Sequence, residues 1–190
     1  HYELSARPLA PDHQGDAAII VSGSVQPGEP ATQERLIQQT ARDVRQHMLN
    51  QGYPQEQVYT LSADLYDAPP TLQDLETALT EWAGAAITEG GTLMLYIVAQ
   101  GGKDASTGTP YIPLNATEEE QTITPTLLNT WLNTLHNERP DIQTTIILEA
   151  PFAAGFAADL QAPNHTILAA AGPDESAWKL HGRILFHHHL

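Results

Sequence analysis

Short, apolar, β-branched runs alternate with longer segments of helical periodicity along most of this chain of 190 residues. The runs, each bounded by Gly, Pro or polar residues, lie at 17–23, 57–62, 92–98, 144–148 and 167–170, with a further one at 183–186. Runs of this length and composition are typical of strands buried in a parallel sheet. The alternation predicts an α/β fold: a three-layer α/β/α sandwich around a mostly parallel sheet of about six strands.

The intervening segments carry the signals of helix ends. Apolar residues recur at helical spacing over 32–50, and Gly52 is placed to end that helix in the left-handed conformation. Thr71 and Asp74 are spaced as a capping box for a helix over 71–82. Thr124 and Pro125 open a helix with proline in the first turn, and a short helix is expected at 153–160. The loop 99–122 contains a candidate edge strand at 111–114.

The length fits one domain of ordinary size. Residues 1–16 have little periodicity and predict an extended lead-in segment, so we expect a single domain over 17–190. The chain begins with His1. We therefore expect a processed form or, in keeping with the resemblance described below, a module of a longer protein.

The net charge of −15 argues against nucleic acid as a partner, because phosphate backbones are bound by clustered Lys and Arg. The same charge argues against an anionic membrane surface, and no apolar run reaches the length of a membrane span. The chain has no cysteine, which excludes a thiol nucleophile, a disulfide and a Cys-ligated zinc.

Two strand ends carry a resemblance to a known family. The run 92–98 continues as Ala99-Gln100-Gly101-Gly102, and the run 144–148 as Glu149-Ala150-Pro151-Phe152-Ala153-Ala154-Gly155. These ends resemble those of the caspase, legumain and gingipain peptidases, especially bacterial legumain-type members, where the first strand ends in His-Gly and the second in Asp-x-Cys. The likeness extends over about 17–186. Gln100 stands at the position of the His and Pro151 at that of the Cys.

The resemblance implies a caspase-like fold that has lost its reactive pair. Gln100 cannot act as a base near neutral pH, and Pro151 has neither a nucleophile nor an N–H group to donate to an oxyanion. We expect a catalytically inactive pseudopeptidase that binds a protein or peptide, or other copies of itself, near the vestigial positions Gln100, Gly101, Glu149 and Pro151. We expect no cofactor, and a place outside the cell or on its surface.

The alternative is a hydrolase or peptidase with a non-thiol nucleophile. Ser176 would be the nucleophile, with His136, His165 or His181 as the base. The chain has no Gly-x-Ser-x-Gly elbow, and this spacing matches no established triad motif.

Metal sites are not expected. His187, His188 and His189 are consecutive, so their side chains point in different directions on a helix. Asp64 and Asp67 supply too few oxygen ligands for calcium. The acidic run 118–120 is typical of a solvated loop or of the negative flank of a following helix.

Overall fold

Five parallel strands form the central sheet of the computed structural model, which describes residues 13–25, 28–65, 69–115 and 121–176 and the backbone of 179–180 and 183–184. The order across the sheet is β2-β1-β3-β7-β8, and every neighbouring pair is parallel. The strands are β1 (Ala17–Ser22), β2 (Val58–Leu61), β3 (Thr92–Val98), β7 (Gln143–Glu149) and β8 (His165–Ala169). The predicted α/β class is confirmed.

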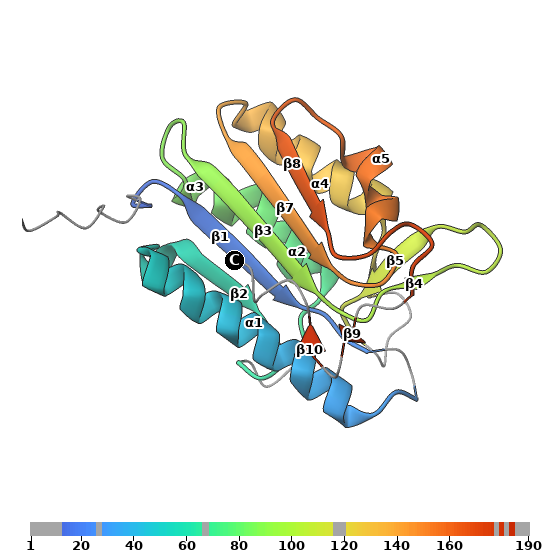
Figure 1. Ribbon diagram of the computed structural model, residues 1–190. Coiled ribbons are helices and arrows are strands. Elements are labelled where there is room, and N and C mark those ends of the chain that lie inside the picture. The colour runs from blue at the N-terminus through green and yellow to red at the C-terminus, as the bar shows by residue number, and fades with distance from the viewer. Residues whose placement is uncertain are drawn as a thin grey trace, which may run out of the picture.

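Helices cover both faces of this sheet (Figure 1). The long helix α1 (Ala31–Gln51) lies across one face. The other face carries the remaining helices: α2 (Leu72–Thr77), η2 (Ala78–Trp82), α3 (Ala83–Ala86), α4 (Pro125–Glu138) and α5 (Ala157–Leu160). Two 3₁₀ turns, η1 (Gln55–Gln57) and η3 (Ala153–Phe156), complete the helical elements.

Alternate residues of each strand supply two separate apolar cores. On β1, Ile19 packs into the larger core beneath α2 to α4, whereas Ile20 packs into the core beneath α1. Leu95 and Tyr96 of β3 divide between the two cores in the same way. This period of two explains why the buried runs are continuously apolar: a strand covered on both faces has no solvent side.

The predicted helix ends are confirmed. Gly52 ends α1 with φ of 101°, a left-handed conformation that strains other residues. Thr71 caps α2 by accepting from the Asp74 backbone N–H, and the Asp74 carboxylate accepts from the Thr71 N–H in return. Thr124 caps α4 through the backbone N–H of Leu127.

Three features differ from the sequence expectations. The helix predicted over 71–82 continues to Ala86 and contains a π-helical segment, η2, where the Ala83 N–H donates to the Ala78 carbonyl oxygen. The central sheet of the described chain has five strands: the two-residue strand β10 (Arg183–Ile184) pairs antiparallel with β9 (Lys179–Leu180) instead. The segment 111–114 contributes β5 (Pro110–Pro113) to a separate antiparallel sheet with β4 (Gly102–Lys103) and β6 (Thr122–Ile123).

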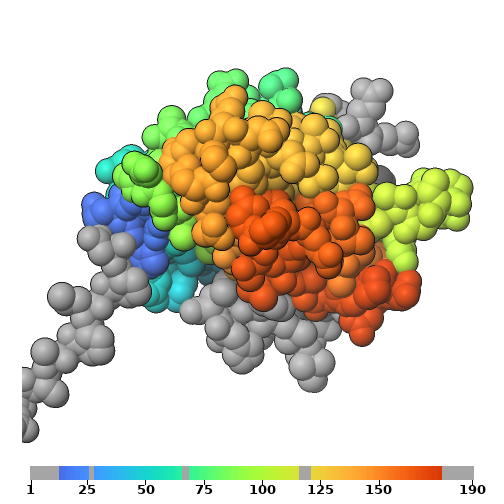
Figure 2. Space-filling view, turned by 90° about the horizontal axis from the view of Figure 1, so that it is seen from above, coloured from blue at the N-terminus to red at the C-terminus, as the bar shows by residue number. Residues whose placement is uncertain are grey.

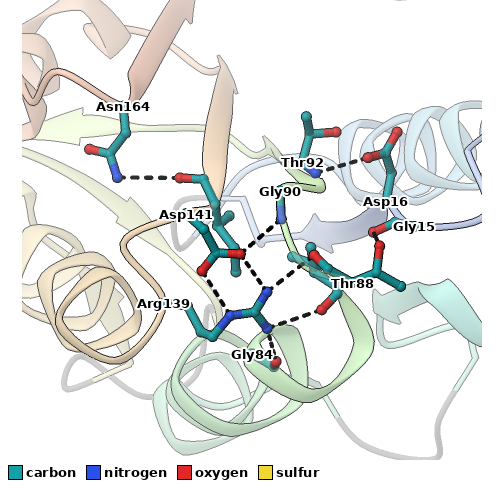
Figure 3. Close-up of polar contacts among 11 residues, drawn as sticks. Gly15, Asp16, Gly84, Thr88, Gly90, Thr92, Arg139, Asp141 and Asn164 are labelled. Carbon is teal, nitrogen blue, oxygen red and sulfur yellow. Dashed lines mark hydrogen bonds and ion pairs between the residues drawn. The ribbon is translucent and has the colours of Figure 1, made fainter.

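Arg139 connects the end of α3 with the loops before β3 and β7, at the end of the sheet where the strands begin (Figure 3). Its guanidinium donates to the backbone carbonyl oxygens of Gly84, Ile87 and Thr88. It also pairs with the Asp141 carboxylate at 2.8 Å, which accepts from the Gly90 N–H at 2.9 Å. These hydrogen bonds hold the pKa of Asp141 well below its usual range. One side chain thus satisfies the last carbonyl groups of α3 and fixes the loop before β3.

Candidate functional site

Gln100, Gly101, Glu149 and Pro151 lie at the carboxyl edge, by which we mean the end of the central sheet where its parallel strands finish. Strands β3 and β7 are neighbours, with Val98 opposite Glu149 in the register. The Ala99 N–H donates to the Glu149 carbonyl oxygen at 3.3 Å, so the ladder continues one residue further. Gln100 and Pro151 each follow this pair of residues by two positions, so they leave the sheet side by side, as the sequence predicts.

Gly101 packs directly against the second strand end. A Cβ atom on Gly101 would lie 2.7 Å from the Pro151 carbonyl oxygen and 3.2 Å from that of Tyr111. Both are backbone atoms, which cannot move without displacing β5 or the turn after β7. Glycine is therefore required here for the close approach of three chain segments rather than for an unusual φ.

Glu149 is buried beneath the edge rather than open to solvent, with 1% of its surface exposed. Its carboxylate accepts a hydrogen bond from the hydroxyl of Tyr96, which is fully buried. Burial, and then the charge and hydrogen bond of Glu149, raise the pKa of Tyr96 well above its usual value. Tyr96 was not predicted from the sequence as a residue of the site. The signal that could have identified it is a hydroxyl group within the most apolar strand. Glu149 therefore lies below the surface of the carboxyl edge, where it fixes the position of the Tyr96 hydroxyl.

The turn after β7 has little capacity left to stabilise an oxyanion. Pro151 is buried and has no N–H group. Phe152 adopts a left-handed conformation with φ of 60°, and its N–H donates to the Glu175 carbonyl oxygen at 2.9 Å. The Ala154 N–H donates to the Ala171 carbonyl oxygen at 3.0 Å. Two of the donors that an acyl-transfer site would need are thus already occupied.

Gln100 is half-buried at the centre of the edge. Its backbone N–H donates to the Ser24 carbonyl oxygen at 3.1 Å, and the Gly23 N–H donates to the Val98 carbonyl oxygen at 2.8 Å. The chain leaving β1 is therefore fixed against the chain leaving β3. In open parallel sheets, ligands bind outside the carboxyl ends of the strands at the point where the strand order reverses, here between β1 and β3.

A projecting hairpin flanks the edge. Strands β4 and β5 extend from the body of the protein and form the yellow-green projection in Figure 2. Its turn is held by Asp104, whose carboxylate accepts from the Ser106 and Thr107 N–H groups at 2.9 and 2.7 Å. Hydrogen bonds from these two residues lower the pKa of Asp104 to about 2. At its base, Lys103 pairs with Asp174 at 2.7 Å and lies 5.6 Å above the Phe152 ring.

Ser176, His136 and His165, the described residues of the alternative mechanism, are not brought together. Ser176 is exposed and follows Glu175, whose carbonyl oxygen accepts from Phe152 at the carboxyl edge. His136 and His165 lie at the opposite end, where the His136 Nε2 is 3.2 Å from the Thr144 hydroxyl and the two rings are 4.9 Å apart. The length of a strand separates them from Ser176. His181 lies outside the described residues.

The candidate metal ligands give no site within the described ranges. No group of three or more His, Asp or Glu side chains there is arranged to hold a metal ion. Asp64 instead pairs with Arg42 and accepts from the Ser62 hydroxyl. Asp67, the acidic run 118–120 and His187 to His189 lie outside the described residues.

A hollow of about 170 Å³ opens beside the edge, between the ends of β1 and β2 and the first half of α1. Its polar lining comes from Ser22, Ser24, Glu34, Gln38 and Asn115, and its apolar lining includes Pro69, Pro70 and Leu114. Sequence reasoning did not find it, because its walls come from four separate segments.

Comparison with other proteins adds no relative: no protein-family model matches the chain, and no curated protein matches it. Among the described helices, none is both long and apolar enough to cross a membrane.

Proposed function

We propose that this chain is a catalytically inactive pseudopeptidase domain of the caspase and legumain type, which binds a protein or peptide at its carboxyl edge. The observation that carries the proposal is the juxtaposition of Gln100 and Gly101 with Pro151 at the ends of two neighbouring strands. That is where a caspase-like peptidase would hold its base and its nucleophile. Here the pair has neither function, and the adjoining N–H groups of Phe152 and Ala154 are occupied.

The edge keeps features that suit recognition of an extended segment. It is flanked by the hairpin of β4 and β5, it carries the half-buried Gln100, and Gly101 and Pro151 give it a firmly packed floor. The caspase-like identity of the fold is part of this proposal. It is supported by the parallel order β2-β1-β3-β7-β8 with helices on both faces.

The test is incubation of the purified chain with a broad peptide library, scored both for capture and for cleavage. We expect capture without cleavage, and affinity for the captured peptides that falls by about fivefold or more in Gln100→Ala. Gln73→Ala, on the exposed surface of α2, is the matched control and should bind normally. Cleavage that disappears in Ser176→Ala would refute the proposal and establish the hydrolase alternative.

Self-association is the other form of the same proposal. Strand β8 is an edge strand of the described sheet, and Leu168 on it is 37% exposed. Unpaired edge strands are templates for pairing with another chain. Light scattering after size exclusion distinguishes the two forms: an assembly subunit elutes as an oligomer that Thr166→Lys on β8 dissociates, and a binding module elutes as a monomer.

A further inference from the structure

Three polar side chains that have no hydrogen-bond partner among the described residues line the hollow between β1, β2 and α1. The first is Ser22, the last residue of β1, which is 2% exposed. Its hydroxyl is buried and has no hydrogen-bond partner among the described residues. Because alternate residues of β1 face opposite sides, Ser22 faces α1 as Ile20 does, and it lines the hollow. A buried hydroxyl left unpaired is costly and requires an explanation.

The other two groups lie on α1. Glu34 and Gln38 are one helical turn apart, so their side chains share a face of the helix, and both line the hollow. Both are half-buried, and the described part of the chain provides neither side chain with a hydrogen bond or ion pair. No described lining residue is basic, so no described side chain of the hollow forms an ion pair with the Glu34 carboxylate.

The acceptors of these three side chains favour one class of ligand. A serine hydroxyl, a carboxylate and an amide oxygen are three acceptors, which match the three N–H donors of a primary ammonium group. The net charge of −15 attracts cations toward the surface in general. Calcium is a poor fit, because it prefers six to eight oxygen ligands and Glu34 is the only carboxylate among the described lining residues.

The dimensions of the hollow agree with a short aliphatic chain. Its volume of about 170 Å³ corresponds to that of roughly five or six waters in the liquid. Pro69, Pro70 and Leu114 give it an apolar wall, along which methylene groups can pack while the charged end reaches polar partners.

We propose that this hollow binds a primary alkylammonium group, as found at the end of a lysine side chain. The inference rests on the proposed binding function, since Ser24 connects the hollow to Gln100 and a peptide lying on the carboxyl edge could insert a lysine there. A free small amine carries the same chemistry, and the experiment separates the two sources.

The test is a titration of the full chain, followed by two-dimensional amide NMR, with three probes: butylamine, a capped Gly-Lys-Gly peptide, and the same peptide acetylated on the lysine Nζ. We expect butylamine and the lysine peptide to shift the signals of Gly23, Ser24, Glu34 and Gln38. Acetylation should weaken binding by about tenfold or more, because it removes the charge and two donors.

Two variants address the site itself. Glu34→Gln should weaken butylamine binding by about tenfold, while Glu81→Gln, exposed on η2, should leave it unchanged. Ser22→Ala should weaken binding and yet raise the melting temperature of the free protein, because it removes an unpaired buried hydroxyl. That opposite pair of effects is not expected of a purely structural serine.

The outcomes separate this inference from the proposed function. Library peptides that bind at Gln100 with no preference for lysine and no sensitivity to Glu34→Gln would overturn the ammonium site and leave the proposed function standing. Butylamine binding that requires Glu34, with no peptide bound anywhere, would establish the site for a small amine and refute the peptide function. Equal affinity for the acetylated and free lysine peptides would overturn the inference.

Discussion

Gly101 and Pro151 are in backbone contact although 50 positions separate them in the sequence: a Cβ atom added to Gly101 would stand 2.7 Å from the Pro151 carbonyl oxygen. The contact joins the ends of β3 and β7 at the carboxyl edge, and a third segment, at Tyr111, lies 3.2 Å from the same point. Any side chain at position 101 would therefore displace the floor of the candidate site.

Gly101→Ala should lower the free energy of unfolding by roughly 1–3 kcal/mol, the usual cost of overpacking a site whose neighbours are backbone atoms. The matched control is Gly84→Ala in α3, where the nearest atoms would be 3.7 and 3.8 Å from the new Cβ. That change should stabilise the protein by up to about 1 kcal/mol through helix propensity. Urea unfolding measures both, and equal effects in the two variants would contradict the close approach at Gly101.

Tyr96→Phe should lower the free energy of unfolding by roughly 1–3 kcal/mol, because it removes a donor from the buried carboxylate of Glu149. A double-mutant cycle with Glu149→Met, which has no carboxylate or amide oxygen to accept the hydrogen bond, isolates the contact. We expect a coupling of at least about 0.5 kcal/mol in urea unfolding. Additive effects of the two substitutions would show that the hydroxyl and the carboxylate do not interact.

The pH dependence of stability should include a contribution from His136. Burial, and then the nearby His165, lower the pKa of His136 in the folded protein below its ordinary value of 6.5. The unfolded chain therefore binds more protons as the pH falls through 6.5, so stability decreases on acidification and recovers as the pH rises. Melting temperatures between pH 7.5 and 5 should fall less steeply in His136→Gln than in the unsubstituted chain; an unchanged slope would argue against this assignment.

Arg139→Lys should destabilise the protein although it keeps the charge. A lysine cannot reach the carbonyl oxygens of Gly84, Ile87 and Thr88 while also pairing with Asp141. We expect the melting temperature to fall by roughly 3–8 °C. Arg35→Lys, on the exposed surface of α1, is the control and should change little. A loss as large in the control would mean that the effect is not specific to this cluster.

Local signals predicted most of the elements correctly. The left-handed end of α1 at Gly52, the capping box of Thr71 and Asp74, and the cap at Thr124 depend on residues within one helical turn of each other. The strand prediction was less complete for 183–186, because the two-residue β10 pairs with β9 and the local pattern does not specify a partner. The π segment at Ala78–Trp82 was also missed, since one extra residue hardly alters the apolar spacing of the helix.

The candidate site, too, could be predicted only in part from the sequence. Its general location follows from the sequence, because parallel strands finish at one edge and Gln100 and Pro151 each follow such a strand. Its details do not. The Tyr96–Glu149 hydrogen bond, the filled N–H groups of Phe152 and Ala154 and the hollow beside Ser22 all join segments that are distant in the chain.

What the amino-acid sequence determined by itself is the succession of strands and helices, their capped ends and the absence of any cysteine thiol, because these depend on residue identity and short-range spacing. Only the tertiary structure decided that Gly101 packs against Pro151, that the buried Glu149 accepts a hydrogen bond from Tyr96 and that Ser22, Glu34 and Gln38 line one hollow. The physical reason is that packing and hydrogen bonding act through space. Their partners are chosen by the register and twist of the whole sheet, which no local pattern records.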